Sequence, residues 1–74
     1  MSNVNCPIFS NIESNLIINP EQVSNETIRS ARLEVLEFAY RIDTMYIASE
    51  EDESYHDEAI AWVENALSLL GYYS

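Results

Sequence analysis

The fold of this chain is decided by the stretch from Ile28 to Tyr46, which reads IRSARLEVLEFAYRIDTMY. Its apolar residues recur at intervals of three and four, the spacing that gathers side chains on one face of an α-helix. The main apolar stripe consists of Ile28, Ala31, Val35, Phe38, Ala39, Ile42, Met45 and Tyr46. Upstream, residues 19–22 (Asn-Pro-Glu-Gln) have the order of a cap, a first-turn proline and a capping box. The pattern predicts a long central helix over about residues 21–48.

A second apolar stripe runs along a different side of the same predicted helix. Its members are Leu33, Leu36, Tyr40 and Ile47. One stripe is enough for a helix that lies on one neighbour, so two stripes predict contacts on two sides. We expect one side to meet the second helix and the other to meet the N-terminal segment or another subunit. A homodimer through these four residues is therefore one hypothesis for the second stripe.

A second helix is predicted over about residues 53–70, where apolar residues again recur with helical spacing. Ser49 and Ser54 each have an acid three positions later, so either serine suits the N-terminal cap of this helix. Gly71 follows directly and suits the C-terminal cap, because glycine adopts positive φ angles without steric cost. The turn between the two predicted helices therefore falls near residues 49–54.

Residues 1–19 fit a helix or a short extended piece equally well. The whole chain of 74 residues is the size of one small domain. The sequence therefore predicts a single acidic all-α domain over residues 1–74, either a helical hairpin or a three-helix domain. In both forms the N-terminal segment is expected to pack on the hairpin.

Charge is distributed unevenly along the chain. The formal net charge is −10, there is no lysine, and all three cations are arginines in the first half. Residues 1–42 hold five acids and three arginines, a balance of −2, whereas residues 43–74 hold eight acids and no cation, a balance of −8. Within the central helix, Glu26–Arg29 and Glu37–Arg41 have the spacing of local ion pairs. Direct binding to nucleic acid is excluded by the sign of the charge.

Carboxylates of the turn and the second helix are the candidate partner-binding groups. Helical carboxylates three or four positions apart lie roughly 5–6 Å from one another, and each DNA strand carries a charge about every 3.4 Å of axis. Such an array resembles a nucleic-acid backbone in charge pattern. The candidate partner-binding residues are Asp43, Glu50, Glu51, Asp52, Glu53, Asp57, Glu58, Trp62 and Glu64. Some of these acids have a simpler explanation, because carboxylates stabilise the first turn of a helix by about 0.3–1 kcal/mol each.

Aromatic side chains border this acidic segment: Tyr55, Trp62, Tyr72 and Tyr73. Buried aromatic residues often contribute most of the binding free energy at protein interfaces. We therefore expect these rings, and Trp62 above all, to pack at the edge of the contact with a partner.

Metal binding and catalysis find little support. Glu53 and His56 have the E-x-x-H spacing of di-iron bundle proteins, but the further carboxylates of such a centre, Glu34 and Glu37, lie several turns away. One histidine, one cysteine and one glycine provide neither a nucleophile–base pair nor a phosphate-binding loop. The sequence predicts no metal, no cofactor and no enzymatic activity.

These features favour an inhibitor that blocks a basic, nucleic-acid-binding surface of another protein. Phages and mobile elements encode small acidic proteins of this size and charge, including anti-CRISPR and anti-restriction proteins that imitate DNA. Two other hypotheses stay open: an antitoxin, immunity protein or regulatory partner that masks a basic protein without imitating DNA, and a self-associating structural hairpin. No stretch approaches the roughly 18 apolar residues of a membrane span, so we expect a cytoplasmic protein, in the host cytoplasm if a phage encodes it.

Overall fold

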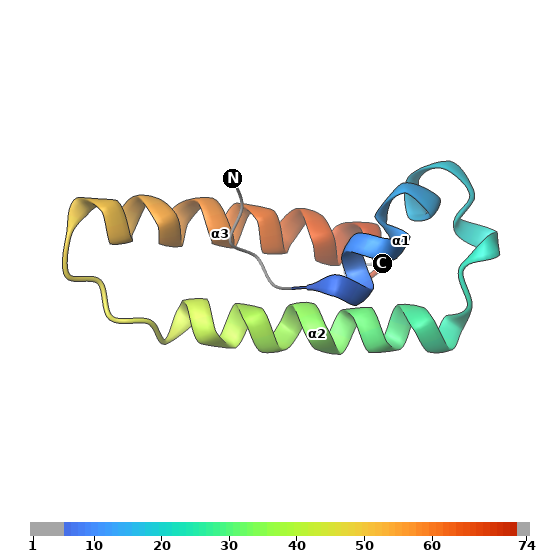
Figure 1. Ribbon diagram of the computed structural model, residues 1–74, viewed down its shortest axis with the longest axis horizontal. Coiled ribbons are helices and arrows are strands. Elements are labelled where there is room, and N and C mark those ends of the chain that lie inside the picture. The colour runs from blue at the N-terminus through green and yellow to red at the C-terminus, as the bar shows by residue number, and fades with distance from the viewer. Residues whose placement is uncertain (1–5, 73–74) are drawn as a thin grey trace.

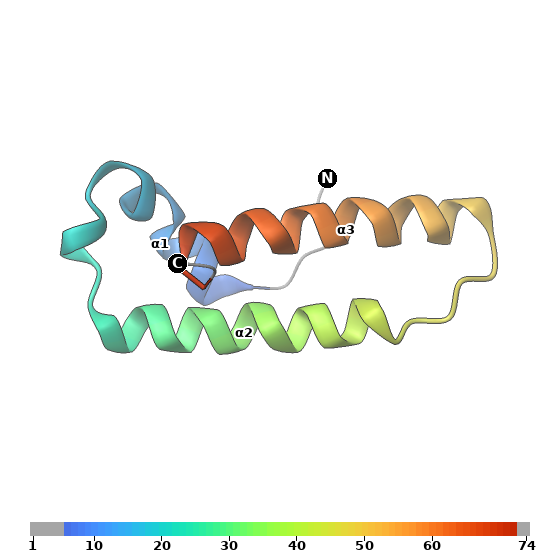
Figure 2. The same ribbon diagram turned by 180° about the vertical axis from the view of Figure 1, so that it is seen from behind.

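The structure is a computed structural model that describes residues 6–72, and within that range the chain forms helices and no strand. The elements in chain order are α1 (Pro7–Ile18), the 3₁₀ helix η1 (Pro20–Gln22), α2 (Asn25–Asp43) and α3 (Glu50–Leu69). α2 and α3 form an antiparallel hairpin, and α1 packs near the end where α2 begins and α3 ends (Figures 1 and 2). The predicted all-α fold is confirmed, in its three-helix form.

The core lies between α2 and α3 along the main apolar stripe. The buried residues of α2 recur at intervals of four, three and four: Ala31, Val35, Phe38 and Ile42. Those of α3 and its C-terminal cap are Ala59, Val63, Ala66, Leu67 and Leu70. Fully burying a large aliphatic side chain stabilises a fold by about 1.5–3 kcal/mol. This interface is therefore the main source of stability in the hairpin.

The central helix begins later than predicted. Val23 is extended, with φ −93° and ψ 124°, and Ser24 is the N-terminal cap of α2. The Ser24 hydroxyl accepts a hydrogen bond from the Thr27 amide at 3.1 Å, which satisfies one of the otherwise free N–H groups of the first turn. The side chain of Asn19 makes no such bond. The proline-led segment therefore forms only the short η1 turn, and a separate helix starts at Asn25.

The central helix also ends earlier than predicted, at Asp43 instead of residue 48. The Thr44 amide donates to the carbonyl oxygen of Tyr40 at 3.1 Å, and the Thr44 hydroxyl donates to the same oxygen at 2.9 Å, so both bonds close the last turn. Residues 45–48 leave the helix because the chain must reverse its direction before α3 begins. Tyr46 is consequently 85% exposed. Its predicted place in the core stripe is wrong.

The second helix begins at Glu50 instead of residue 53, because Ser49 and not Ser54 is its cap. The Ser49 hydroxyl accepts from the Asp52 amide at 3.2 Å, and the Asp52 carboxylate accepts from the Ala48 amide at 3.0 Å. This reciprocal pair closely resembles a capping box. Two backbone N–H groups at the start of α3 are thereby satisfied by neighbouring side chains.

The C-terminal end of α3 is closed as Gly71 predicts. Gly71 has a positive φ of 75°. The Tyr72 amide donates to the Leu67 carbonyl at 2.9 Å, and the Gly71 amide donates to the Ser68 carbonyl at 3.1 Å. This is the hydrogen-bond pattern of a Schellman motif, in which a glycine in the left-handed region ends the helix.

The N-terminal segment is helical where the structure describes it, which settles the choice that the sequence left open. Phe9 of α1 is 1% exposed and packs edge to face on Trp62. The two ring centroids are 5.5 Å apart, and the ring planes are inclined at 85°. Trp62 also meets Phe38 at 5.7 Å and 86°. Edge-to-face pairs at such distances contribute about 0.5–1.5 kcal/mol beyond area burial. The three rings come from α1, α2 and α3, so they join all three helices.

A carboxylate of α2 caps the N-terminus of α1. Cys6 is the N-terminal cap residue, but its side chain makes no capping hydrogen bond. Instead, Glu34 accepts from the Ile8 amide at 3.1 Å and from the Phe9 amide at 3.0 Å, one bond to each carboxylate oxygen. A negative charge at a helix N-terminus is also favoured by the helix dipole. Glu34 therefore attaches α1 to the hairpin.

An arginine of α2 makes the corresponding contact at the C-terminus of α3. Arg32 donates from Nη2 to the Leu70 carbonyl at 3.0 Å, and its guanidinium carbon lies 6.0 Å from the centroid of the Tyr72 ring. A cation is favoured at the negative end of the helix dipole. α2 thus holds one end of each of the other helices through a charged side chain.

Cys6 is expected to react slowly with thiol reagents while the protein is folded. Burial raises the pKa of its thiol from 9.0 to about 11, and the nearby Glu34 carboxylate adds to the rise. At pH 8 the reactive thiolate is then about 100-fold scarcer than in the unfolded chain. Labelling by Ellman's reagent at pH 8 should be at least about 100-fold slower in the native protein than in urea. Equal rates in the two states would show that Cys6 is accessible in the folded protein and that the pKa of its thiol is not raised.

Candidate functional site

Four carboxylates lie in a line on the solvent side of α3, and together they are called the acidic face: Glu50, Glu53, Asp57 and Glu64. All four are exposed. Their successive spacings of three, four and seven residues keep them on one side of the helix, away from the buried stripe. At 1.5 Å of rise per residue the line is about 21 Å long. All four are among the candidate partner-binding residues named from the sequence, and that role stays a prediction.

Two further predicted site residues, Glu51 and Glu58, form a second row beside the acidic face. Both are exposed, and they are seven residues apart on α3. Glu58 lies one helical turn before Trp62 and therefore on the side of α3 that carries α1. The two rows together give the outer surface of α3 six carboxylates.

Asp52 and Asp43 are placed differently from the other predicted acids. Asp52 is half-buried and accepts the Ala48 amide at the start of α3, so its side chain is occupied by capping. Asp43 is exposed at the last position of α2, so it stands near the turn of the hairpin but on the other helix. Neither residue extends the acidic face.

The predicted aromatic anchor, Trp62, is chiefly a core residue. It is half-buried, and its ring packs against Phe9 and Phe38. Tyr55 is half-buried against the same core. Tyr72 is 47% exposed beside Arg32, and Tyr73 lies outside the described residues. The acidic face therefore has carboxylates but no aromatic side chain among its own members.

His56 lies at the edge of the core, with a side chain that is 24% exposed. Its Nδ1 is 3.4 Å from the Asp57 Oδ1, a long contact between neighbouring residues. Within residues 6–72 no group of three or more histidine, cysteine, aspartate or glutamate side chains is arranged to hold a metal ion. The E-x-x-H spacing of Glu53 and His56 thus acquires no further ligands from α2.

The carboxylates of α3 are not neutralised by the arginines. In the described part of the chain no arginine nitrogen comes within 4.0 Å of a carboxylate oxygen, and the ion pairs expected for Glu26–Arg29 and Glu37–Arg41 do not form. Arg29 and Arg41 are exposed on α2, and Arg32 is engaged with the end of α3. The negative field of the acidic face is therefore screened by solvent and salt alone.

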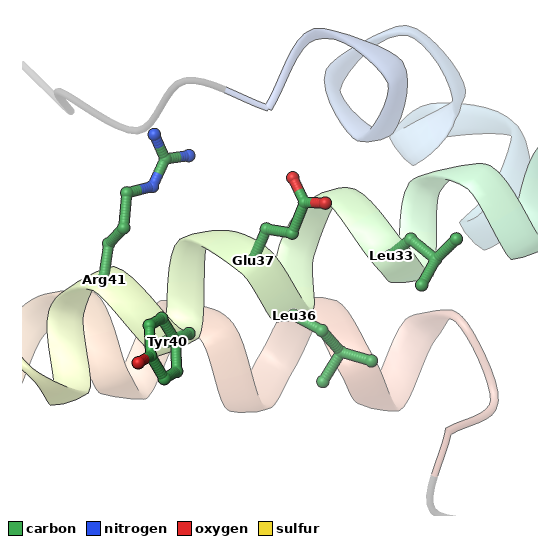
Figure 3. Close-up of a pocket in the computed structure, with 5 residues that line it drawn as sticks. All are labelled: Leu33, Leu36, Glu37, Tyr40 and Arg41. Carbon is green, nitrogen blue, oxygen red and sulfur yellow. The ribbon is translucent and has the colours of Figure 1, made fainter.

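A second surface lies on α2 and is called the α2 patch: Leu33, Leu36 and Tyr40. Leu33 is 64% exposed and Tyr40 is 71% exposed, while Leu36 is half-buried. The three side chains border a shallow hollow of about 460 Å³, and Glu37 and Arg41 complete its lining (Figure 3). Ile47, the fourth residue of the predicted stripe, is 43% exposed but lies beyond the end of α2. Its predicted place in a helical stripe is wrong, because the helix stops before it.

Among residues 6–72, none of the helices combines the length and the apolar composition that crossing a bilayer requires. Comparison of the chain with protein-family models, with curated protein sequences and with solved structures finds no match.

Proposed function

We propose that this protein is an inhibitor that occupies a basic, nucleic-acid-binding surface of another protein. The observation that supports the proposal is the unpaired acidic surface of α3, whose carboxylates have no arginine within ion-pair distance in residues 6–72. A surface of one sign attracts partners of the opposite sign and accelerates their association. The proposed partner therefore presents arginine and lysine side chains.

The spacing of the carboxylates suits imitation of a nucleic-acid strand. The acidic face spans about 21 Å, and over that length one DNA strand presents about six charges. The acidic face presents four carboxylates over this length, and the second row, about 100° further round the helix, adds Glu51 and Glu58. A channel built to bind a phosphate backbone would thus meet a similar number of negative charges. Anti-CRISPR and anti-restriction proteins of the DNA-mimic type are the functional classes with this chemistry.

The position of Trp62 defines how such binding would work. Because this ring packs within the core, the acidic face has no large apolar side chain to insert into a partner. The binding free energy is then mainly electrostatic, which implies fast association and a steep decline of affinity with salt.

Capture from a host lysate tests this proposal. The full-length protein is immobilised at about 50 mM salt, and bound proteins are eluted first by a salt gradient and, in a parallel sample, by duplex DNA or RNA. We expect a basic nucleic-acid-binding protein that elutes below about 300 mM salt and that nucleic acid displaces. Elution by salt but not by nucleic acid would instead identify a masking partner, such as a toxin bound by its antitoxin. Retention that is indifferent to salt would contradict both.

A further inference from the structure

We propose that the α2 patch binds a second copy of this chain, through antiparallel packing of the two α2 helices about a two-fold axis near Leu36. In this arrangement Leu33 of each copy lies beside Tyr40 of the other. Arg29 of each copy lies beside Asp43 of the other. The occupant is thus a copy of the same helix, and the contact is independent of the acidic face on α3.

The apolar part of the patch has the form of a helix-packing site. Leu33, Leu36, Glu37 and Tyr40 occupy positions i, i+3, i+4 and i+7 of one helix and line one hollow (Figure 3). Four residues at this spacing form the hole that receives one side chain of a facing helix in knobs-into-holes packing. The hollow therefore fits a side chain from another helix, and Leu33 and Tyr40 lose the most exposed surface when it is filled.

The charged residues at the two ends of the patch are complementary under two-fold symmetry. Arg29 and Asp43 are both exposed, and each is seven positions from Leu36. A two-fold interface places residue i of one copy against residue j of the other, and j against i. An axis near Leu36 therefore brings Arg29 to the partner's Asp43 and Asp43 to the partner's Arg29. Two Arg29–Asp43 ion pairs, one at each end of the patch, then flank the apolar centre.

The same two residues cannot pair within one copy. They are fourteen positions apart on a continuous helix, which separates them by about 21 Å. Arg29 and Asp43 can therefore pair only between two copies, when a second α2 helix packs antiparallel against the first. A parallel arrangement would place arginine against arginine and aspartate against aspartate.

The net charge of the protein does not prevent this association. α2 holds four acids and three arginines, a balance of −1, so the remainder of the chain carries −9 of the total −10. The acidic face lies on α3, whereas the proposed contact is made by α2. Charges further apart than the Debye length of about 8 Å at physiological ionic strength are largely screened from one another. Added salt screens the remaining repulsion between the two copies further, so we expect the apolar contact to persist at high salt.

Sedimentation of the full-length protein tests the proposal. We expect the average mass to rise from 8.5 kDa toward twice that value between about 5 and 200 µM, and to do so at least as readily in 0.5 M NaCl. Leu33→Glu should weaken the dimer at least tenfold. Ile17→Glu is the matched control, because Ile17 on α1 is also 64% exposed and lies outside the patch. The control should dimerise like the wild type, and circular dichroism confirms that both variants are folded.

A charge exchange distinguishes the proposed register from any other apolar contact. Arg29→Asp and Asp43→Arg should each weaken the dimer, and the double variant should recover it. A monomer at 200 µM overturns the proposal, and so does a double variant that stays as weak as the single ones. If the wild type is monomeric and Leu33→Glu abolishes capture of a basic protein, the patch binds that protein and not a second copy. If Leu33→Glu loses the dimer but still captures a basic protein in a salt-sensitive way, the dimer proposal is supported and the proposed inhibitor function is unaffected.

Discussion

Replacing Trp62 with alanine is expected to leave much of the protein unfolded at 25 °C. The ring lies between Phe9 and Phe38 and contacts both edge to face. Truncating a large aromatic residue in a core lowers the free energy of unfolding by about 3–5 kcal/mol, and a domain of this size has only about that much in total. Urea titration followed by circular dichroism at 222 nm measures the loss, because helix content does not depend on the missing indole.

The matched control for this substitution is Tyr46→Ala. Tyr46 is also aromatic, but it is 85% exposed in the segment between α2 and α3. Its removal should change the free energy of unfolding by no more than about 0.5 kcal/mol. If Trp62→Ala unfolds at the same urea concentration as Tyr46→Ala, Trp62 is not part of the core. The prediction from the sequence, that this ring packs against a partner, would then be favoured.

Neutralising three acids of α3 is expected to abolish most of the binding to a basic partner. The variant Glu53→Gln/Asp57→Asn/Glu64→Gln changes the net charge from −10 to −7. Each carboxylate that pairs with a partner's arginine or lysine contributes about 1–1.5 kcal/mol, so three of them account for about 100- to 1000-fold in affinity. Calorimetry or surface plasmon resonance with the captured protein measures the change. The slope of affinity against salt should become shallower at the same time.

A second triple variant separates the position of the charges from their number. Glu13→Gln/Glu21→Gln/Glu26→Gln also changes the net charge to −7, and all three residues are exposed on α1, η1 and the first turn of α2. This control should lose less than about tenfold in affinity, since only long-range attraction is reduced. Equal losses in the two variants would mean that net charge alone governs binding. The acidic face would then have no special role.

The helical core could be predicted from periodicity because the burial pattern follows directly from it. Ala31, Val35, Phe38 and Ile42 are buried where their spacing placed them. Gly71 ends α3 because few other residues adopt its φ of 75° without steric cost. Asp57 and Glu64 could likewise be predicted to share a face, because both lie within the predicted second helix. Glu50 could not, because that helix was predicted to begin only near residue 53.

Helix ends and tertiary contacts could not be predicted in the same way. Both Ser49 and Ser54 satisfy the local capping pattern, and only the geometry of the hairpin selects Ser49. Glu34 caps α1 from 25 or 26 residues away in sequence, and no local spacing indicates such a contact. The sequence presents Trp62 as a surface aromatic. Its ring is covered only because residues 7–18 form α1, and the sequence leaves the helical state of that segment open.

α2 makes the charged contacts that hold the three helices together, whereas the outer surface of α3 makes none within residues 6–72, and this difference affects which positions can change in evolution. The charged contacts that attach α1 and the end of α3 come from Glu34 and Arg32 of α2. The capping of α3 is confined to its first turn and its last. Its outer carboxylates have no structural partner among the described residues, apart from the long contact of Asp57 with His56. Sequence drift on that outer surface is therefore expected to leave the fold intact, so the surface can change while the three-helix scaffold stays the same.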